Sequence, residues 1–99
     1  MAEPDAALLA VVNRGEYALN GFRNRDVRQT LHGHNGDAVA RRRQMGRVGR
    51  QLALLRAHGL IRKVSRTHRY LVTEKGRRVI TALLAARRAN TEQLVSFAT

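Results

Sequence analysis

The residues of this sequence best suited to chemistry are arginines that recur along one stretch of the chain. Three of them are Arg43, Arg47 and Arg50. At about 100° per residue on a helix, these three fall within about 60° of one another. A guanidinium group makes paired hydrogen bonds to phosphate oxygens and to the edge of guanine. The spacing therefore predicts a helical surface that binds a phosphate-bearing polymer, with Gln44 and Gln51 flanking it.

The overall charge also favours a polyanionic partner. The sequence has 19 Lys and Arg residues against 7 Asp and Glu, a formal net charge of +12 over 99 residues. Lys63 and Lys75 are its only lysines, and no acidic residue occurs in the range 38–73. A GC-rich coding bias would explain the preference for arginine but not the shortage of acids. Such an imbalance destabilises a compact chain by self-repulsion, so a surface that served only solubility would not need it. Because guanidinium groups match phosphates and guanine edges, we expect a nucleic acid rather than a membrane surface as the partner.

These arginines need a helix with an apolar side opposite to them. The sequence predicts such a helix starting between residues 37 and 42 and ending near His58. Its buried side is expected to consist of Met45, Val48, Leu52 and Leu55. Because Arg41 falls in the middle of this apolar arc, we expect the regular helix to begin after it, over residues 42–58. Gly59 follows, where a left-handed residue commonly ends a helix.

Two glycines lie inside this helix, Gly46 and Gly49. Each costs about 0.5–1 kcal/mol relative to alanine in a helix interior, so each needs a compensating reason. Gly46 lies toward the arginine side and is interpreted as a place where a nucleic-acid backbone comes close. Gly49 is interpreted as a point of close packing against the preceding helix.

A basic hairpin is predicted directly after this helix. Residues 60–64 and 68–72 are rich in the residue types that strands prefer, and residues 65–67 are enough only for a tight turn. The hairpin carries four cations, Arg62, Lys63, Arg66 and Arg69. Thr73, followed by Glu74, is typical of a helix N-cap and predicts another helix from that point.

The N-terminal third is expected to supply two shorter helices. The first is capped by Asp5 and the second by Asn24. Arg23 and Arg25 flank the start of the second helix, where they are expected to hold a phosphate together with the free N–H groups of its first turn. Residues 32–37 form the loop that leads to the arginine-bearing helix.

The segments GRQLALLRAHGLIRKV and HRYLVTEKGR resemble the recognition helix and wing of winged-helix bacterial regulators of the MarR/ArsR type. The resemblance covers about residues 20–80, and small uncharacterised bacterial proteins carry the same hairpin. It implies a mainly helical α+β fold, a winged helix-turn-helix of four to five helices with a two- or three-stranded wing. Residues 15–22 are interpreted, from their own sequence, as a turn or a short extended piece. Gly49 departs from the pattern, since these regulators often place Ser or Thr there. The chain also lacks the extra helices that build an effector pocket in the MarR type.

The segment after Glu74 is predicted to be helical, with one apolar face made of Val79, Ile80, Leu83 and Leu84. Asn90 and Gln93 resemble a capping pair that would break the helix. An unbroken helix would instead be about 36 Å long. Residues 90–99 are interpreted either as a tail that packs on the first helix or as a segment that forms a homodimer. Three apolar residues, Leu94, Val95 and Phe97, are available for either role.

Little in the sequence could support catalysis, so we expect a protein that is not an enzyme and needs no cofactor or metal. Cysteine is absent, and His32 with His34 is interpreted as part of a surface loop rather than a metal site. The longest apolar runs, such as residues 6–12, are too short to cross a membrane, and the N-terminus lacks the basic start of a secretory signal. We expect one cytoplasmic, nucleoid-associated domain over residues 1–99, with its core at about residues 5–89.

Together these features predict sequence-specific binding of double-stranded DNA by a bacterial transcriptional regulator. Residues 42–58 would enter the major groove, and the wing, residues 61–72, would contact the backbone or minor groove. Two alternatives stay open. A winged helix could bind RNA with the same charge, although RNA recognition usually needs exposed aromatic side chains and the sequence has only Tyr17, Phe22, Tyr70 and Phe97. It could also be a protein–protein docking module in a larger nucleic-acid complex, against which the charge of +12 argues.

Overall fold

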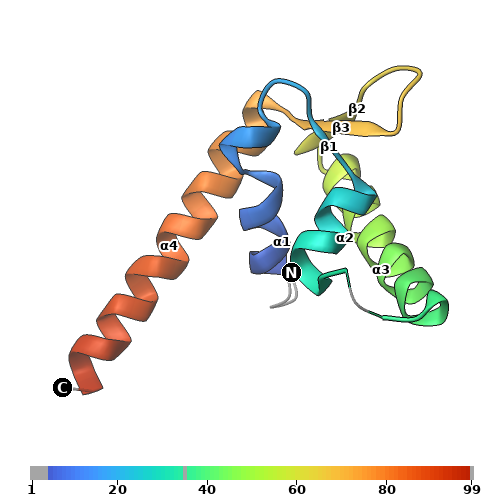
Figure 1. The fold of residues 1–99 in the computed structure, drawn as a ribbon. Helices are drawn as coiled ribbons and strands as arrows, with labels where there is room; N and C mark the ends of the chain where they lie inside the picture. The colour runs from blue at the N-terminus through green and yellow to red at the C-terminus, as the bar shows by residue number, and fades with distance from the viewer. Residues whose placement is uncertain (1–4, 35, 99) are drawn as a thin grey trace.

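The computed structural model describes residues 5–34 and 36–98, and these form a mainly helical fold with one small antiparallel sheet (Figure 1). In chain order the elements are α1 (Asp5–Val12), the 3₁₀ turn η1 (Gly15–Tyr17), β1 (Phe22–Arg23), α2 (Asn24–His32), α3 (Ala38–Ala57), β2 (Ile61–Lys63), β3 (Arg69–Val72) and α4 (Glu74–Ala98). The predicted α+β class, with four helices and a three-stranded sheet in the described residues, is confirmed.

The sheet has the strand order β1–β3–β2, and both pairings are antiparallel. β2 and β3 form the predicted hairpin, and β1 adds a third strand in which Phe22 pairs with Tyr70. Gly21 makes this addition possible, because its φ is +76° and an added Cβ would collide with the carbonyl oxygen of Tyr70. The segment expected as a turn or short extended piece is therefore a 3₁₀ turn followed by an edge strand.

One apolar core joins the helices to the sheet. Its buried members are Leu8, Leu9, Val11, Val12, Phe22, Val27, Val48, Leu52, Leu55, Leu60, Ile61 and Ile80. In Figure 1, α1 lies between α4 and α2, and the sheet lies at the end of the molecule where α2 and α4 begin. The core is therefore built from every helix, although each contributes only part of its length.

The end of α3 confirms the role predicted for Gly59. Its φ is +73°, its N–H donates to the carbonyl of Arg56 at 3.0 Å, and the N–H of Leu60 donates to the carbonyl of Leu55 at 3.0 Å. This pair of bonds is the Schellman arrangement, which satisfies carbonyl groups left open at the end of a helix. It turns the chain sharply, so that Leu60 is buried and β2 begins.

The start of α4 is fastened to the same turn. The hydroxyl of Thr73 accepts the N–H of Gly76 at 2.9 Å and donates to the carbonyl of Gly59 at 2.7 Å, which confirms the predicted N-cap. Gly76 lies so close to Leu60 that an added Cβ would collide with the Leu60 carbonyl group, whose carbon would be 2.7 Å away. Backbone therefore packs directly on backbone where α4 begins.

The start of α2 differs from the prediction. Its N-cap is Arg23, and Asn24 is the first helical residue. The carboxylate of Asp26 accepts the N–H of Arg23 at 2.8 Å, so this end of the helix does not need the Asn24 side chain. The Asn24 amide instead donates to the carbonyl of Met45 on α3 at 3.0 Å. Asn24 therefore links two helices rather than capping one.

The start of α3 also differs. The helix begins at Ala38, because Asp37 caps it by accepting a first-turn N–H at 2.7 Å. The prediction that the regular helix begins after Arg41 is therefore wrong. Arg41 fits in the helix because its side chain is exposed, and α3 has buried side chains only from Val48 onward. For the same reason Met45, which was predicted to be buried, is 45% exposed.

The N-terminal part of α4 packs on the body of the molecule. At the end of α1, Asn13 donates to Thr81 and accepts from Arg77, each at 3.4 Å. The predicted apolar face is used only in part, since Ile80 is buried whereas Leu83 is 47% exposed. The contact with α1 therefore holds this helix near its start.

The rest of α4 continues without a break past Asn90 to Ala98, so of the two possibilities left open by the sequence the unbroken helix is the one that forms. At 1.5 Å per residue, its 25 residues extend about 37 Å. Figure 1 shows this helix running out beyond α1 and away from the other elements. The side chains of Leu94, Val95 and Phe97 lie outside the described part of the structure.

Candidate nucleic-acid interface

The first half of α3, residues 38–47, stands apart from the core. None of its side chains is buried, whereas Val48, Leu52 and Leu55 in the second half all are. The Asp37 cap fixes the free end of this half, which is about 15 Å long. The helix therefore presents most of its circumference to solvent over nearly three turns.

The outer side of α3 carries a surface that we term the α3 basic face. Its members are Val39, Arg42, Arg43, Gly46, Arg47 and Arg50, all exposed and all lining one shallow hollow. The structure thus brings together the arginines at positions 43, 47 and 50, as their spacing predicted. Sequence reasoning missed Arg42 and Val39. The four-residue spacing of Arg42, Gly46 and Arg50 is the signal that would have found the first of them.

The two glycines of α3 have different surroundings. An added Cβ on Gly49 would contact Nδ2 of Asn24 at 3.4 Å, which agrees with its interpretation as a packing point against α2. An added Cβ on Gly46 would meet only Nη1 of Arg50, at 3.5 Å, among the described atoms. Both distances are ordinary van der Waals contacts, so a steric clash with the described part of the fold does not require glycine at either position.

The two glutamines predicted to flank the arginines lie toward the core side of α3. Gln44 is half-buried, and its Oε1 atom is buried with no hydrogen-bond partner in the described part of the chain. Gln51 is also half-buried. Neither residue lines the hollow of the α3 basic face.

The tip of the β2–β3 hairpin is a second basic surface. Arg62, Lys63 and Arg66 are all exposed. The turn is held by the hydroxyl of Thr67, which donates to the carbonyl of Val64 at 2.8 Å. Arg66 has a φ of +62°, a left-handed conformation that costs a non-glycine residue free energy. The hairpin therefore holds this cation at its outermost turn in spite of a backbone strain.

Two further arginines border the hairpin. Arg69 was predicted to contact a ligand, but it is half-buried and donates to the carbonyl of Asn20 at 3.2 Å, so it also fastens β3 to the segment before β1. Arg56, in the last turn of α3, was not predicted. It lines a hollow together with Lys63 and Arg66, which connects α3 to the hairpin tip.

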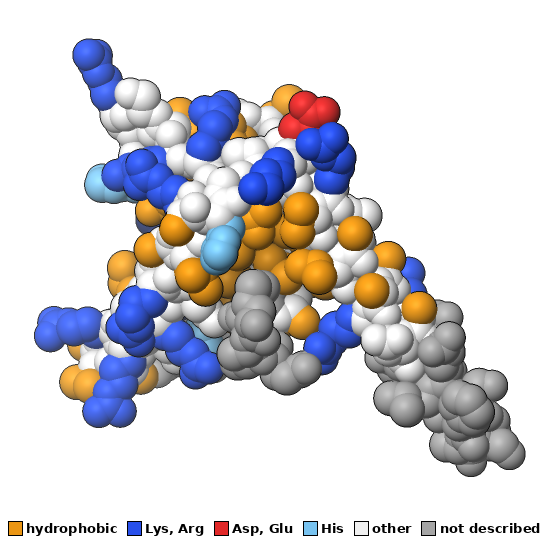
Figure 2. Space-filling model, turned by 180° about the vertical axis from the view of Figure 1, so that it is seen from behind, with side chains coloured by type: hydrophobic (Ala, Val, Ile, Leu, Met, Phe, Trp, Pro, Cys, Tyr) orange, Lys and Arg blue, Asp and Glu red, His pale blue; other side chains and the backbone are white. Residues whose placement is uncertain are grey.

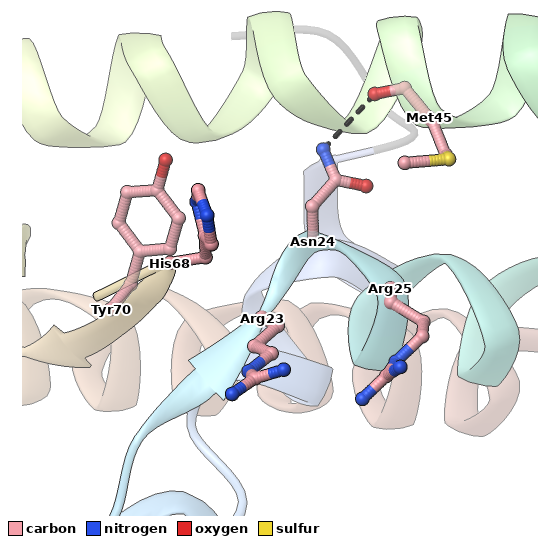
Figure 3. Close-up of a pocket in the computed structure, with 6 residues that line it drawn as sticks. All are labelled: Arg23, Asn24, Arg25, Met45, His68 and Tyr70. Carbon is pink, nitrogen blue, oxygen red and sulfur yellow. Dashed lines mark hydrogen bonds between the residues drawn. The ribbon is translucent and has the colours of Figure 1, made fainter.

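A third basic surface lies at the start of α2. A pocket there is lined by Arg23, Asn24, Arg25, Met45, His68 and Tyr70 (Figure 3). Figure 3 shows the side chains of Arg23 and Arg25 running together, away from α3. The Nε atom of Arg23 and the Oδ1 atom of Asn24 are buried and have no hydrogen-bond partner among the residues that the structure describes. The predicted pair of arginines therefore shares one pocket with residues of α3 and of the hairpin.

Acidic side chains do not neutralise these surfaces. Among the side chains that the structure describes, Arg14 and Glu16 form the one ion pair, at 3.2 Å, and neither belongs to the three surfaces. In Figure 2, Lys and Arg side chains gather over the beginning of α3 at the lower left and over the hairpin tip at the upper left. The positive charge of these elements is therefore available to a ligand.

The described aromatic side chains are engaged in packing. Phe22 is buried; its ring stacks on Tyr70 with centroids 5.9 Å apart and meets Tyr17 edge-on at 5.8 Å. Tyr17 and Tyr70 are half-buried. Among the described side chains, no aromatic ring is exposed as the stacking platform that single-stranded RNA usually requires.

Comparison with known proteins gives no family: the chain matches no protein-family model, and no match was found among curated proteins or among solved structures. Over the described residues, no helix is long and apolar enough to cross a membrane. His32 and His34 are exposed. Among the residues that the structure describes, no group of three metal-binding side chains comes together. A proposal for the function therefore rests on the geometry and charge of the three basic surfaces.

Proposed function

We propose that the protein is a winged helix-turn-helix domain that binds double-stranded DNA in a sequence-dependent manner and acts as a transcriptional regulator. In this proposal α3 is the recognition helix, α2 supports it, and the β2–β3 hairpin is the wing. The observation that carries the proposal is the first half of α3, which has no buried side chain and displays arginines without acidic partners.

The dimensions of α3 suit the major groove. A helix with its side chains is about 10–12 Å across, and the groove is about 12 Å wide. The exposed half of α3 is about 15 Å long, which corresponds to about four base steps. The α3 basic face would then place guanidinium groups against base edges and the adjoining phosphates.

The other two surfaces would position the domain on the DNA backbone. Phosphate contacts fix the register of a protein on the duplex, whereas base contacts provide specificity. Lys63 and Arg66, which line one hollow on the wing, would contact one stretch of backbone, and Arg62, on the opposite face of β2, would contact another. Arg23 and Arg25, which line one pocket at the start of α2, would bind a phosphate.

Salt dependence of binding tests the electrostatic part of this proposal. If about 5–6 phosphates are neutralised, a plot of log K against log salt should have a slope near −5. A slope shallower than about −2 would contradict it. Competition by an RNA hairpin and by heparin should be weaker than competition by duplex DNA of the preferred sequence. Preferential displacement by RNA would support the RNA-binding alternative.

Substitutions in α3 test the recognition role. Arg47→Ala or Arg50→Ala should cost about 1–3 kcal/mol of binding free energy on the preferred site and less on unrelated duplexes. Arg78→Ala is the matched control, because it removes the same charge from an exposed position that lies outside the three basic surfaces. An equal loss in the control would indicate a general charge effect, and equal losses on every sequence would make Arg47 and Arg50 phosphate contacts only.

A further inference from the structure

An aliphatic side chain lies among the arginines of the α3 basic face. Val39 is 61% exposed and lines the same hollow as the four arginines and Gly46. On a helical wheel it falls between Gly46 and Arg50, about 20° from each. Val39 is therefore near the middle line of this face, in the first turn of the helix.

The position of Val39 is informative because the rest of the face is cationic or lacks a side chain. A surface that bound only phosphates would gain nothing from an apolar group on its middle line. In the major groove, the apolar group that a base pair presents is the C5-methyl group of thymine. In helix-turn-helix proteins, the residues that contact base edges are those near the N-terminus of the recognition helix.

The neighbours of Val39 favour a close approach to the groove floor. Valine is short and has one strongly preferred rotamer in a helix, so little freedom is lost when it packs against a partner. Gly46, two turns further along, leaves space in which the nearest atom of the described residues is Nη1 of Arg50, at 3.5 Å from an added Cβ. Arg43, one turn from Val39, can meet a guanine edge nearby.

We propose that Val39 is a specificity-determining residue that contacts the C5-methyl group of a thymine in the major groove. This inference rests on the proposed DNA-binding function and names one base that the recognition helix reads. The preferred site should then contain a thymine within about two base pairs of a guanine, because one helical turn rises about 5.4 Å and one base step about 3.4 Å.

The test is a cycle of protein and DNA changes on the full chain. A preferred duplex is first selected from random sequences, and each thymine is then replaced by uracil, which removes only the methyl group. At one position the replacement should weaken binding of the unmodified protein about fourfold, the value expected for burial of one methyl group. Val39→Ala should bind the thymine duplex about as weakly, and it should lose little more with uracil at that position.

A matched control is Leu83→Ala, which shortens an aliphatic side chain of similar exposure, 47%, on α4. It should retain the full sensitivity to uracil. Both exposed positions should leave the melting temperature nearly unchanged. If replacing each thymine by uracil lowers the affinity of Val39→Ala by the same factor as that of the unmodified protein at every position, Val39 does not contact a thymine methyl group. The proposed DNA-binding function would be unaffected by that result. If no duplex sequence is preferred, the sequence-reading role of α3 and this inference both fail.

Discussion

Two helices extend beyond the core of this protein, and they do so for different reasons. The projecting part of α4 contains Ala85, Ala86 and Ala89, residues of the highest helix propensity. The projecting half of α3 is also made mostly of good helix formers, but it contains Gly46, and Gly49 follows in the same helix; each glycine costs about 0.5–1 kcal/mol relative to alanine. Two contacts hold this half of α3 in place. Asp37 caps its start, and the Asn24 amide of α2 donates to the carbonyl of Met45.

This difference supports the proposal that α3, rather than α4, binds the ligand. A helix rich in alanine can extend into solvent because of its own propensity. A glycine-containing helix that extends into solvent with unpaired arginines is maintained at a cost in stability, which selection for binding would explain.

The largest effect is expected where α4 is anchored. Gly76→Ala places a Cβ against the backbone of Leu60, which cannot move without displacing the α3–β2 turn. We expect a loss of about 3 kcal/mol or more in the free energy of unfolding, measured by urea denaturation. A variant with unchanged stability would show that α4 is not seated on this turn.

The second half of α3 should be much more sensitive than its outer side. Leu55→Ala should lower the free energy of unfolding by about 2–5 kcal/mol, because Leu55 is fully buried and its loss leaves a cavity. Leu54→Ala is the neighbouring control, since Leu54 is 46% exposed, and it should cost about 0.5 kcal/mol or less. Similar losses in the two variants would contradict the assignment of the buried side of α3.

The wing should separate stability from binding. Arg66→Gly relieves the left-handed strain and should raise the free energy of unfolding by about 1 kcal/mol, yet weaken DNA binding through loss of the cation. Arg66→Glu should weaken binding further without lowering the melting temperature, because residue 66 is exposed. Normal DNA affinity of both variants would show that the hairpin is not a DNA-contacting wing.

A smaller change of the same kind is expected at Gly46, the counterpart of Gly76 in an open environment. Gly46→Ala should raise the free energy of unfolding by about 0.5–1 kcal/mol, because alanine favours the helix and the added methyl group meets only the flexible Arg50 side chain. It should nevertheless weaken DNA binding if the groove approaches the backbone there. Stabilisation with unchanged affinity would leave Gly46 outside the interface.

The weakest effect concerns the projecting part of α4. We expect two chains to pair through it, so that two recognition helices meet half-sites about one helical turn apart. Repulsion between chains of charge +12 should keep the pairing weak and make it stronger at high salt. Sedimentation of the full chain beside a version ending at residue 89 is the measurement. A monomeric full chain at about 100 μM in high and low salt, with DNA affinity unchanged by truncation, would exclude pairing.

Several features of this protein followed from the sequence because their causes are local. Gly59 and Thr73 end one helix and start another through bonds within a few residues, so their roles could be predicted. The clustering of Arg43, Arg47 and Arg50 depends only on the geometry of a single helix. The hairpin strands followed similarly from the residue types on either side of a short turn.

Other features depended on contacts between distant segments, which a local pattern does not contain. Met45 has the spacing of a core residue, but the core ends at Val48, so how far the other elements reach along α3 decided its exposure. Arg28 would be expected at the surface from its charge alone, yet it is buried with Nε and Nη1 unpartnered. Asn24 would cap its own helix, but a carbonyl on α3 binds its amide instead. The sequence thus determined the helices, the hairpin and the arginine spacing, whereas tertiary packing decided which side chains of α2 and α3 face solvent, because burial depends on residues far apart in the chain.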